Sequence, residues 1–346
     1  MCVTKIFGAE LREMVAHYIF LSALPIRPMR PSIRIVVTVV LGSACIAGAL
    51  LVVKQRAQTR FDQSLEHGRY LVEAVAICFE CHSERDYTHR GWPIPKGRVG
   101  GGRILWGEGT ASQLVAPNIS PDRDTGLGSW SDEEIMRAIR DGVAPDGHLL
   151  NPEMPSRYFH RLSEDDLRAI VSYLRSIPPV RHKLPKNSRN NMTESESTIL
   201  MDSLTLANRD PEVLRGEFLV RIAACETCHT PTRDGKYITG LAFGGGVIFK
   251  HGTETAASTN LTSDPSGIAY YDRERFVEVM RTGTVGARPL ASAMPWSFYR
   301  NMTTEDLRSI FAYLRSVPPA RHDVDNSEPP TLCRRCGNRH GLGDRN

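Results

Sequence analysis

Hydrophobic residues in this chain recur mostly three or four positions apart, which is the spacing of an amphipathic helix. Leu71, Val75 and Cys78 follow this spacing and predict a helix that ends at the first Cys-rich segment. A second helix is expected over residues 167–176, because Ser163 supplies a cap before it and two prolines stop it afterwards. The pattern therefore indicates a mainly α-helical fold.

The same pattern occurs twice. The segment Leu-Arg-Ala-Ile-Val-Ser-Tyr-Leu-Arg-Ser-Ile-Pro-Pro at 167–179 matches Leu-Arg-Ser-Ile-Phe-Ala-Tyr-Leu-Arg-Ser-Val-Pro-Pro at 307–319. A glycine triplet and a Met-Pro pair also occur once in each half. Matching segments are about 140 to 148 residues apart throughout, which is typical of a tandem duplication.

A length of 346 residues agrees with two domains of ordinary size. We predict the first domain at residues 60–180 and the second at 212–320. The polar segment 181–211 is expected to connect them, and residues 321–346 to form a polar tail.

The N-terminal part has a different pattern. Residues 1–34 have no recognisable role, whereas 35–53 contain no charged side chain. As a helix, the apolar segment would extend roughly 28 Å, close to the thickness of the hydrocarbon core of a bilayer. We therefore predict a transmembrane helix over 35–53. A cleaved secretion signal is the alternative, and it would leave a soluble protein.

Each repeat contains one Cys-x-x-Cys-His pentapeptide, the attachment signature of haem c. Two thiols on one helical turn add to the vinyl groups of a porphyrin, and the following histidine binds the iron. A zinc site or a redox dithiol is the alternative use of such a pattern. We predict two covalent haems, with thioethers from Cys78, Cys81, Cys225 and Cys228 and proximal ligands from His82 and His229.

The sixth iron ligands are predicted from the Met-Pro pairs. Met154 and Met294 occupy equivalent positions about seventy and sixty-five residues after the pentapeptide histidines, and proline stiffens each loop. A thioether ligand raises the potential of the iron, which suits an electron carrier. His148, His160 and Met302 are the alternative ligands, but they lack this combination of proline and repetition.

Three further features of the sequence bear on its chemistry. The glycine triplets at 100–102 and 244–246 are expected to let the backbone approach the haem edge. Cys333 and Cys336 are followed by glycine instead of histidine, so a third haem would lack its ligand. A disulfide, a dithiol or a decayed site remain open there, and we expect the tail to be functionally silent. The mild formal charge of +4 gives no reason to expect a nucleic-acid partner.

Taken together, the pentapeptides, the Met-Pro pairs, the final helix and the segment Asn-Ile-Ser-Pro-Asp-Arg-Asp-Thr-Gly-Leu-Gly-Ser-Trp-Ser at 118–131 resemble class I cytochrome c domains. More narrowly, residues 63–320 resemble the cytochrome subunits of bacterial membrane-bound alcohol and gluconate dehydrogenases. The resemblance implies tandem small helical domains around one haem each, and a subunit that passes electrons from a dehydrogenase toward quinone or an oxidase. This chain differs from that family, whose subunits usually carry three haems and are often anchored otherwise.

The predicted function is a di-haem electron carrier that is not itself an enzyme. It would take single electrons from a dehydrogenase or quinol-linked donor and pass them to a terminal oxidase, a soluble cytochrome or another acceptor. The alternatives are a di-haem peroxidase and the di-haem subunit of a haem–copper oxidase. Thioether attachment implies maturation outside the cytoplasm, so we expect the domains on the periplasmic side of a bacterial inner membrane.

Overall fold

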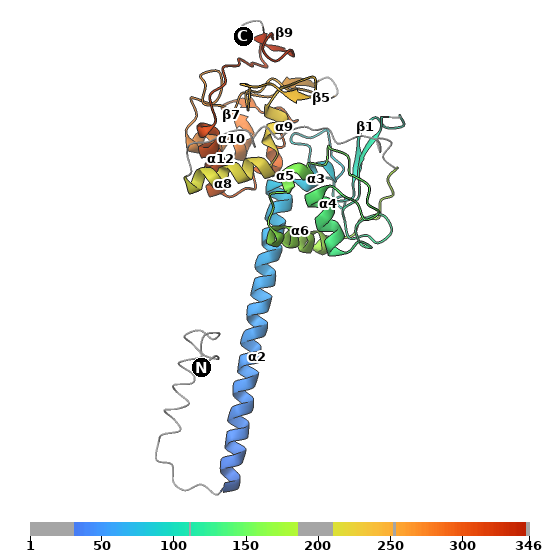
Figure 1. Ribbon diagram of the computed structural model, residues 1–346, viewed down its shortest axis with the longest axis vertical. Coiled ribbons are helices and arrows are strands. Elements are labelled where there is room, and N and C mark those ends of the chain that lie inside the picture. The colour runs from blue at the N-terminus through green and yellow to red at the C-terminus, as the bar shows by residue number, and fades with distance from the viewer. Residues whose placement is uncertain (1–30, 111, 186–209, 252–253, 344–346) are drawn as a thin grey trace. The chain divides into compact units, whose positions relative to one another are not determined.

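The computed structural model describes residues 31–110, 112–185, 210–251 and 254–343 (Figure 1). For residues 31–45, 251 and 254 it describes the backbone alone. The predicted N-terminal segment lies almost wholly outside this part, as does most of the predicted linker. The chain divides into two units, residues 1–61 and 62–346. Apart from residues 60 and 61, both predicted cytochrome domains fall within the second unit.

The first unit consists, in its described part, of helix α2 (Pro31–Tyr70), which continues into the second unit. In the part of the chain that the structure describes, no helix is long and apolar enough to cross a membrane. The side chains of residues 31–45 are not described, and this range includes more than half of the predicted membrane helix. The structure therefore does not support the predicted transmembrane helix over 35–53.

The first half of the second unit is built mainly from helices. After α2 come the π-helical turn η1 (Leu71–Val75), α3 (Cys78–Cys81), the strands β1 (Arg103–Trp106) and β2 (Leu114–Ala116), and the helices α4 (Asp132–Asp141), α5 (Ser156–Phe159) and α6 (Glu164–Ser176). β1 and β2 pair in antiparallel fashion. Ser163 caps α6 as expected, because its hydroxyl accepts a hydrogen bond from the backbone N–H of Asp166.

The second half repeats this order with more short strands. Its helices are α8 (Pro211–Ile222), α9 (Cys225–His229), α10 (Arg273–Thr282), α11 (Trp296–Tyr299) and α12 (Thr304–Ser316). The antiparallel pairs are β3 (Thr232–Arg233) with β4 (Lys236–Tyr237), β5 (Ile248–His251) with β6 (Glu254–Ala257), β7 (Thr284–Val285) with β8 (Arg288–Pro289), and β9 (Pro330–Leu332) with β10 (Arg339–Gly341). Helices thus dominate in both halves, as the hydrophobic spacing predicts.

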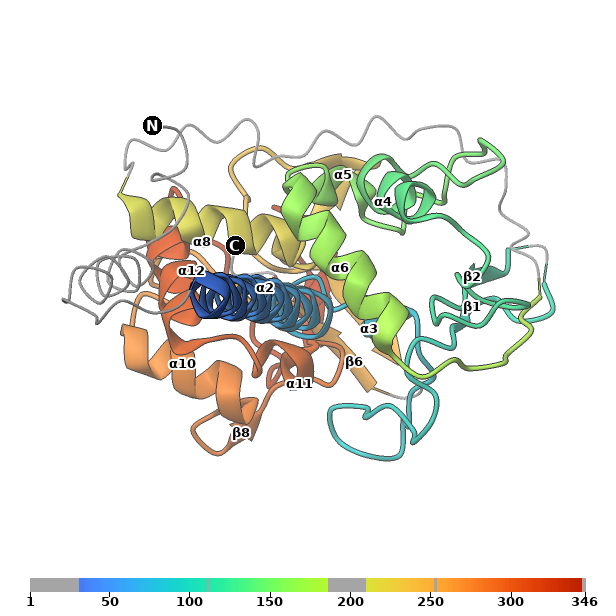
Figure 2. The ribbon, with the colours of Figure 1, turned by 90° about the horizontal axis from the view of Figure 1, so that it is seen from below.

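In each half, the helix that leads into the Cys-rich turn packs against the last helix (Figure 2). A glycine lies where the two backbones meet. A Cβ atom on Gly68 would lie 1.9 Å from the carbonyl oxygen of Ala169, and one on Gly216 would lie 1.9 Å from that of Ser309. No side chain fits at such a distance, so both crossings require glycine.

An ion pair joins the same two helices in each half. His67 and Asp166 are 2.6 Å apart in the first half, and Arg215 and Asp306 are 2.8 Å apart in the second. Asp306 also accepts a 2.6 Å hydrogen bond from the hydroxyl of Tyr70, which belongs to the first half. The two halves are therefore joined by a polar contact as well as by one continuous hydrophobic core.

The glycine triplets pack against segments that the sequence pattern did not point to. Among the described residues, neither triplet lines the large cavity of the second unit. A Cβ on Gly102 would lie 2.5 Å from Leu184, and one on Gly246 would lie 2.5 Å from His322, so each triplet packs against the segment that follows its last helix. Local sequence did not reveal this later segment, and the expected approach of the glycine backbone to the haem edge stays a prediction.

Candidate functional site

The two Cys-x-x-Cys-His segments adopt nearly the same backbone. The residue before each first cysteine is left-handed, with φ 44° and ψ 45° at Ile77 and φ 50° and ψ 35° at Ala224. This conformation is unfavourable for residues with a side chain. Strain of this kind persists where the surroundings over-determine it, commonly at functional sites. Here it makes a sharp turn that starts the short helix carrying the two thiols.

The pentapeptide histidines are held in matching orientations. The Nδ1 atom of His82 lies 2.7 Å from the backbone carbonyl oxygen of Pro117, and that of His229 lies 2.8 Å from the carbonyl oxygen of Thr259. Each Nδ1–H donates to a carbonyl, which leaves Nε2 with a free lone pair. Burial lowers the pKa of both histidines, so the neutral form is favoured. A neutral imidazole fixed through its other nitrogen is the usual arrangement of a metal-binding histidine.

The four pentapeptide thiols lie in apolar surroundings. Burial raises the pKa of Cys78 and of Cys225 to about 12 and that of Cys81 to about 11. None of the four is joined in a disulfide. In the described part of the chain, neither pentapeptide belongs to a group of side chains close enough to share one metal ion.

The two Met-Pro loops also repeat each other. The N–H of Met154 donates to the carbonyl of Asn151 at 2.9 Å, and the N–H of Met294 donates to that of Ala291 at 3.0 Å. In both loops the proline directly precedes a one-turn helix, α5 or α11. Both methionines are half-buried against the core. The two Met-Pro loops therefore have the same local structure.

All eight predicted haem residues line one continuous cavity of about 1870 Å³. Its wall includes Cys78, Cys81, His82, Met154, Cys225, Cys228, His229 and Met294. Aliphatic side chains and the aromatic rings of Trp130 and Tyr271 complete it. Thiols, imidazole nitrogen and thioether in an apolar enclosure are the donor set that a covalent haem requires. The residues present therefore fit two haems.

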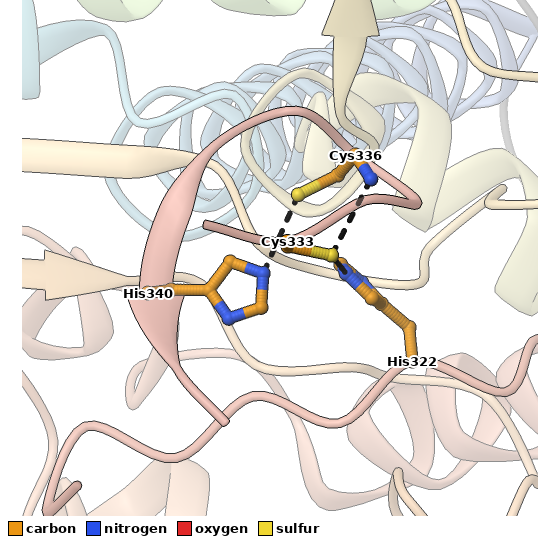
Figure 3. A group of neighbouring side chains, drawn as sticks. All are labelled: His322, Cys333, Cys336 and His340. Atoms are coloured by element: carbon orange, nitrogen blue, oxygen red, sulfur yellow. Dashed lines mark hydrogen bonds between the residues drawn. The ribbon is translucent and has the colours of Figure 1, made fainter. Parts of the chain in front are cut away.

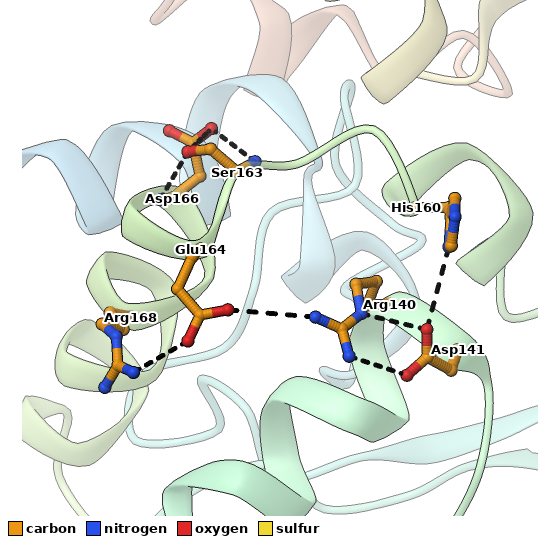
Figure 4. Close-up of polar contacts among 7 residues, drawn as sticks. All are labelled: Arg140, Asp141, His160, Ser163, Glu164, Asp166 and Arg168. Atoms are coloured by element: carbon orange, nitrogen blue, oxygen red, sulfur yellow. Dashed lines mark hydrogen bonds and ion pairs between the residues drawn. The ribbon is translucent and has the colours of Figure 1, made fainter.

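The alternative axial ligands lie in other surroundings. His160 is exposed and forms an ion pair with Asp141 at 3.7 Å, and it does not line the cavity (Figure 4). His148 reaches the cavity rim but is exposed and hydrogen-bonded to Asp146. Met302 lines the cavity and is 1 % exposed, so it also contributes to the core.

The two predicted sites contact each other through reciprocal side chains. Glu80 lies between the cysteines of the first motif and pairs at 2.8 Å with Arg85, whose guanidinium lies 4.6 Å from the ring centroid of Phe298 in the second half. Conversely, the hydroxyl of Tyr158 in the first half donates to Glu226, between the cysteines of the second motif, at 3.4 Å. The Met-loop helix of the first half therefore contacts the second Cys-x-x-Cys turn directly, and that of the second half contacts the first turn through Arg85.

Burial raises the pKa of Cys228, and the carboxylate of Glu80 raises it further across the interface between the halves. Tyr299 is buried there, and its hydroxyl donates to the carbonyl oxygen of Ala223 at 2.9 Å. The carboxylate of the first motif therefore contributes to the electrostatic surroundings of one thiol of the second.

Sequence reasoning missed one group of residues. The tail expected to be polar and silent contains the β9–β10 hairpin, in which Cys333 and Cys336 are buried. The spacing Cys-x-x-Cys-x-x-x-His at 333–340 was the available signal, but only the fold brings in His322 from before the hairpin.

Comparison with known proteins confirms the resemblance predicted from the motifs. No family model matches the chain. It is 28 % identical over 287 residues to the cytochrome c subunit of alcohol dehydrogenase (quinone) from Gluconobacter oxydans, covering 76 % of this chain and 56 % of that protein. It is 25 % identical over 277 residues to the gluconate 2-dehydrogenase cytochrome c subunit of Pantoea cypripedii, covering 74 % and 60 %.

A third relative is a diheme cytochrome c-type protein of Cereibacter sphaeroides, with 27 % identity over 262 residues, 70 % of this chain and 82 % of that protein. The chain spans about half the length of the dehydrogenase subunits it matches. Several relatives are thus cytochrome c subunits of dehydrogenases, which supports electron transfer by a cytochrome c.

Proposed function

We propose that this protein is a di-haem cytochrome c that relays single electrons from a dehydrogenase or quinol-linked donor to a terminal oxidase or another acceptor. The observation that carries the proposal is the duplicated donor set, two Cys-x-x-Cys-His motifs and two Met-Pro loops, around one shared cavity. When bound, each haem supplies a one-electron Fe(III)/Fe(II) couple.

The chain's own residues define how such a couple would be tuned. The carbonyls of Pro117 and Thr259 fix the rings of His82 and His229, so that Nε2 of each ring is available to the iron. Met154 and Met294 supply a neutral sulfur ligand that favours the reduced state. The apolar cavity wall limits water, and the reciprocal contacts between the halves keep the two sites together. These features favour electron transfer over chemistry on a bound substrate.

The dehydrogenase partner is inferred from the relatives, which are cytochrome subunits of alcohol, fructose and gluconate dehydrogenases. Mixing the oxidised protein with such a dehydrogenase and its substrate tests this inference. We expect the haem absorption bands to change to those of the reduced form on the time scale of dehydrogenase turnover. Reduction no faster than in the absence of the dehydrogenase would exclude it as the donor.

A spectroscopic experiment tests the ligand assignment. In the oxidised protein, we expect two low-spin irons and a near-infrared sulfur-to-iron band. Met154→Ala and Met294→Ala should each remove about half of that band, and the double variant should remove all of it. Met302→Leu is the matched control and should leave the band unchanged, because it removes a thioether that we assign to the core.

A high-spin iron in the unaltered protein would contradict the relay for that site. It would favour the peroxidase alternative, which needs an open sixth position and a nearby acid–base group. Glu153 is the one carboxylate directly beside either Met, and it is exposed. Turnover of hydrogen peroxide by the unaltered protein would be the corresponding measurement.

We further propose that the haem domains act outside the cytoplasm, on the periplasmic side of a bacterial inner membrane, because thioether attachment occurs there. Cell fractionation with antibody detection tests this location, and the same fractions report whether the chain sediments with membranes. Recovery of the haem-loaded chain in the cytoplasm would refute it.

A further inference from the structure

Four metal-binding side chains meet in the C-terminal hairpin, away from both predicted haem sites. They are His322, Cys333, Cys336 and His340, all buried, with their ligand atoms within 4.8 Å of one another (Figure 3). Cys333 and Cys336 flank the turn that joins β9 to β10, His340 lies on β10, and His322 precedes the hairpin. None of the four lines the large cavity.

Two of the distances between these atoms are close to those of a tetrahedral site. Nε2 of His322 lies 3.3 Å from Sγ of Cys333, and Nε2 of His340 lies 3.3 Å from Sγ of Cys336. Zinc bound at about 2.3 Å from sulfur and about 2.0 Å from nitrogen would place neighbouring sulfur and nitrogen atoms roughly 3.6 Å apart. The observed spacing is within a few tenths of an ångström of that value.

The surroundings orient all four ligands. Nδ1 of His322 lies 2.9 Å from the carbonyl oxygen of Gly244, and Nδ1 of His340 lies 3.0 Å from that of Gly341. Both Nδ1–H groups therefore donate outward, and both Nε2 lone pairs face the sulfurs. Backbone N–H groups of Cys336 and Asn338 each lie 3.4 Å from a sulfur and donate to it, which stabilises thiolates.

We propose that His322, Cys333, Cys336 and His340 bind one structural zinc ion through Nε2, Sγ, Sγ and Nε2. Two thiolates neutralise the charge of the ion, and binding releases two thiol protons to solvent. Four protein ligands leave no open position, so the ion stabilises the fold and does not activate water. The small group of buried hydrophobic residues around the hairpin agrees with a module that needs such a link.

A disulfide between Cys333 and Cys336 is the competing arrangement for two cysteines at this spacing. A disulfide has no thiolate and binds no ion. The Nε2 atoms of His322 and His340, which face the sulfurs, would then have no ion to bind. The convergence of both imidazoles on the sulfurs is therefore what favours the ion.

The first half provides an internal comparison. His182 occupies the place equivalent to His322, and its Nδ1 lies 2.9 Å from the carbonyl oxygen of Gly101, just as Nδ1 of His322 lies 2.9 Å from that of Gly244. The Nε2 atom of His182 faces Glu84 at 3.8 Å instead of a cysteine pair. In both halves, this histidine thus holds the glycine loop through a hydrogen bond from Nδ1–H. The cysteine pair facing Nε2 is found in the second half, among the described residues.

The cluster is connected to the second predicted haem site through this glycine loop. The amide of Gly245 donates to the carbonyl oxygen of His229 at 2.8 Å. The side-chain amide of Asn338, next to the Cys pair, donates to the carbonyl oxygen of Gly246 at 2.9 Å. The ion would therefore hold the loop that in turn holds the backbone of His229.

The test is to measure zinc per polypeptide in the full chain and to record its zinc K-edge absorption spectrum. Zinc is counted against amino-acid analysis, so the result does not depend on haem loading. We expect one zinc per chain, with a first shell of two sulfurs near 2.3 Å and two nitrogens near 2.0 Å. Because this measurement uses the unaltered protein, it stays decisive even if every variant fails to fold.

Variants then assign the ligands. Cys333→Ser with Cys336→Ser, and separately His322→Gln, should lower zinc by at least tenfold after dialysis against a weak chelator. His182→Gln is the matched control and should keep one zinc per chain, because it breaks only the equivalent clamp of the first half. Less than one-tenth zinc per chain, a mass lower by two hydrogens from a Cys333–Cys336 disulfide, or a shell of oxygen and nitrogen alone would overturn the proposal.

Discussion

The close crossing of α8 and α12 at Gly216 predicts that Gly216→Ala destabilises the protein. The new methyl group would lie 1.9 Å from the carbonyl oxygen of Ser309 and 2.8 Å from Cβ of Tyr313. Reaching even 3.0 Å from the oxygen requires a shift of 3.0 − 1.9 = 1.1 Å between α8 and α12. Overpacking of this kind costs about 1–3 kcal/mol, and the backbone, unlike a side chain, has no other rotamer to adopt.

Alanine also favours a helix over glycine by about 1 kcal/mol, which offsets part of this cost. We expect the overpacking cost to lie at the upper end of its range, about 3 kcal/mol, because the displaced oxygen belongs to the hydrogen-bonded backbone of α12. Subtracting the helix preference of about 1 kcal/mol leaves a net loss of about 2 kcal/mol. For a unit of this size, such a loss lowers the melting temperature by about 4–8 °C. Since α8 leads directly into the second Cys-x-x-Cys-His, the low-spin spectrum of the second haem should change more than that of the first.

Thermal unfolding of the haem-loaded chain, followed by circular dichroism and by haem absorption, measures the effect. Gly68→Ala places a methyl group 1.9 Å from the carbonyl oxygen of Ala169, so it should destabilise the protein similarly but affect the first haem. Gly48→Ala is the control, since nothing lies within 4 Å of its new methyl group. A Gly216→Ala protein as stable as the unaltered one would refute the close crossing.

Two further predictions concern charge and the glycine loop. Burial raises the pKa of Asp306, but hydrogen bonds from Arg215 and a tyrosine hydroxyl lower it by more, so the net pKa lies below its usual value. The stabilisation is therefore present above about pH 4 and is lost as the pH falls through the folded-state pKa. Asp306→Asn should lower the free energy of unfolding by about 2 kcal/mol at pH 7. In urea titrations at lower pH, this difference in unfolding free energy from the unaltered protein should shrink. A difference that does not depend on pH would contradict the ion pair. Gly246→Ala places a methyl group 2.5 Å from a ring carbon of His322. It should lower the amount of zinc bound per chain and leave the spectrum of the first haem unchanged. Full zinc retention, measured as zinc per polypeptide, would contradict this packing.

The sequence by itself determined the features that depend on neighbouring residues. A Cys-x-x-Cys-His turn carries its covalent chemistry within five positions, and its recurrence with a Met-Pro pair predicted eight residues that all line one cavity. The cap of α6 was equally local, because Ser163 and Asp166 are three positions apart in one turn. Repetition supplied what spacing alone does not, since it distinguished Met154 and Met294 from other methionines.

Tertiary structure decided the features that join distant segments. The reciprocal contacts between Arg85 and Phe298, and between Tyr158 and Glu226, required the two halves to pack together, and no local pattern encodes that packing. The packing of the glycine triplets was hidden for the same reason, because the segment each one touches follows the last helix of its half. The four-residue cluster of the tail depends on a hairpin that folds back on the glycine loop. Ligand geometry of this kind arises from the closure of the chain in space, which spacing along the sequence does not specify.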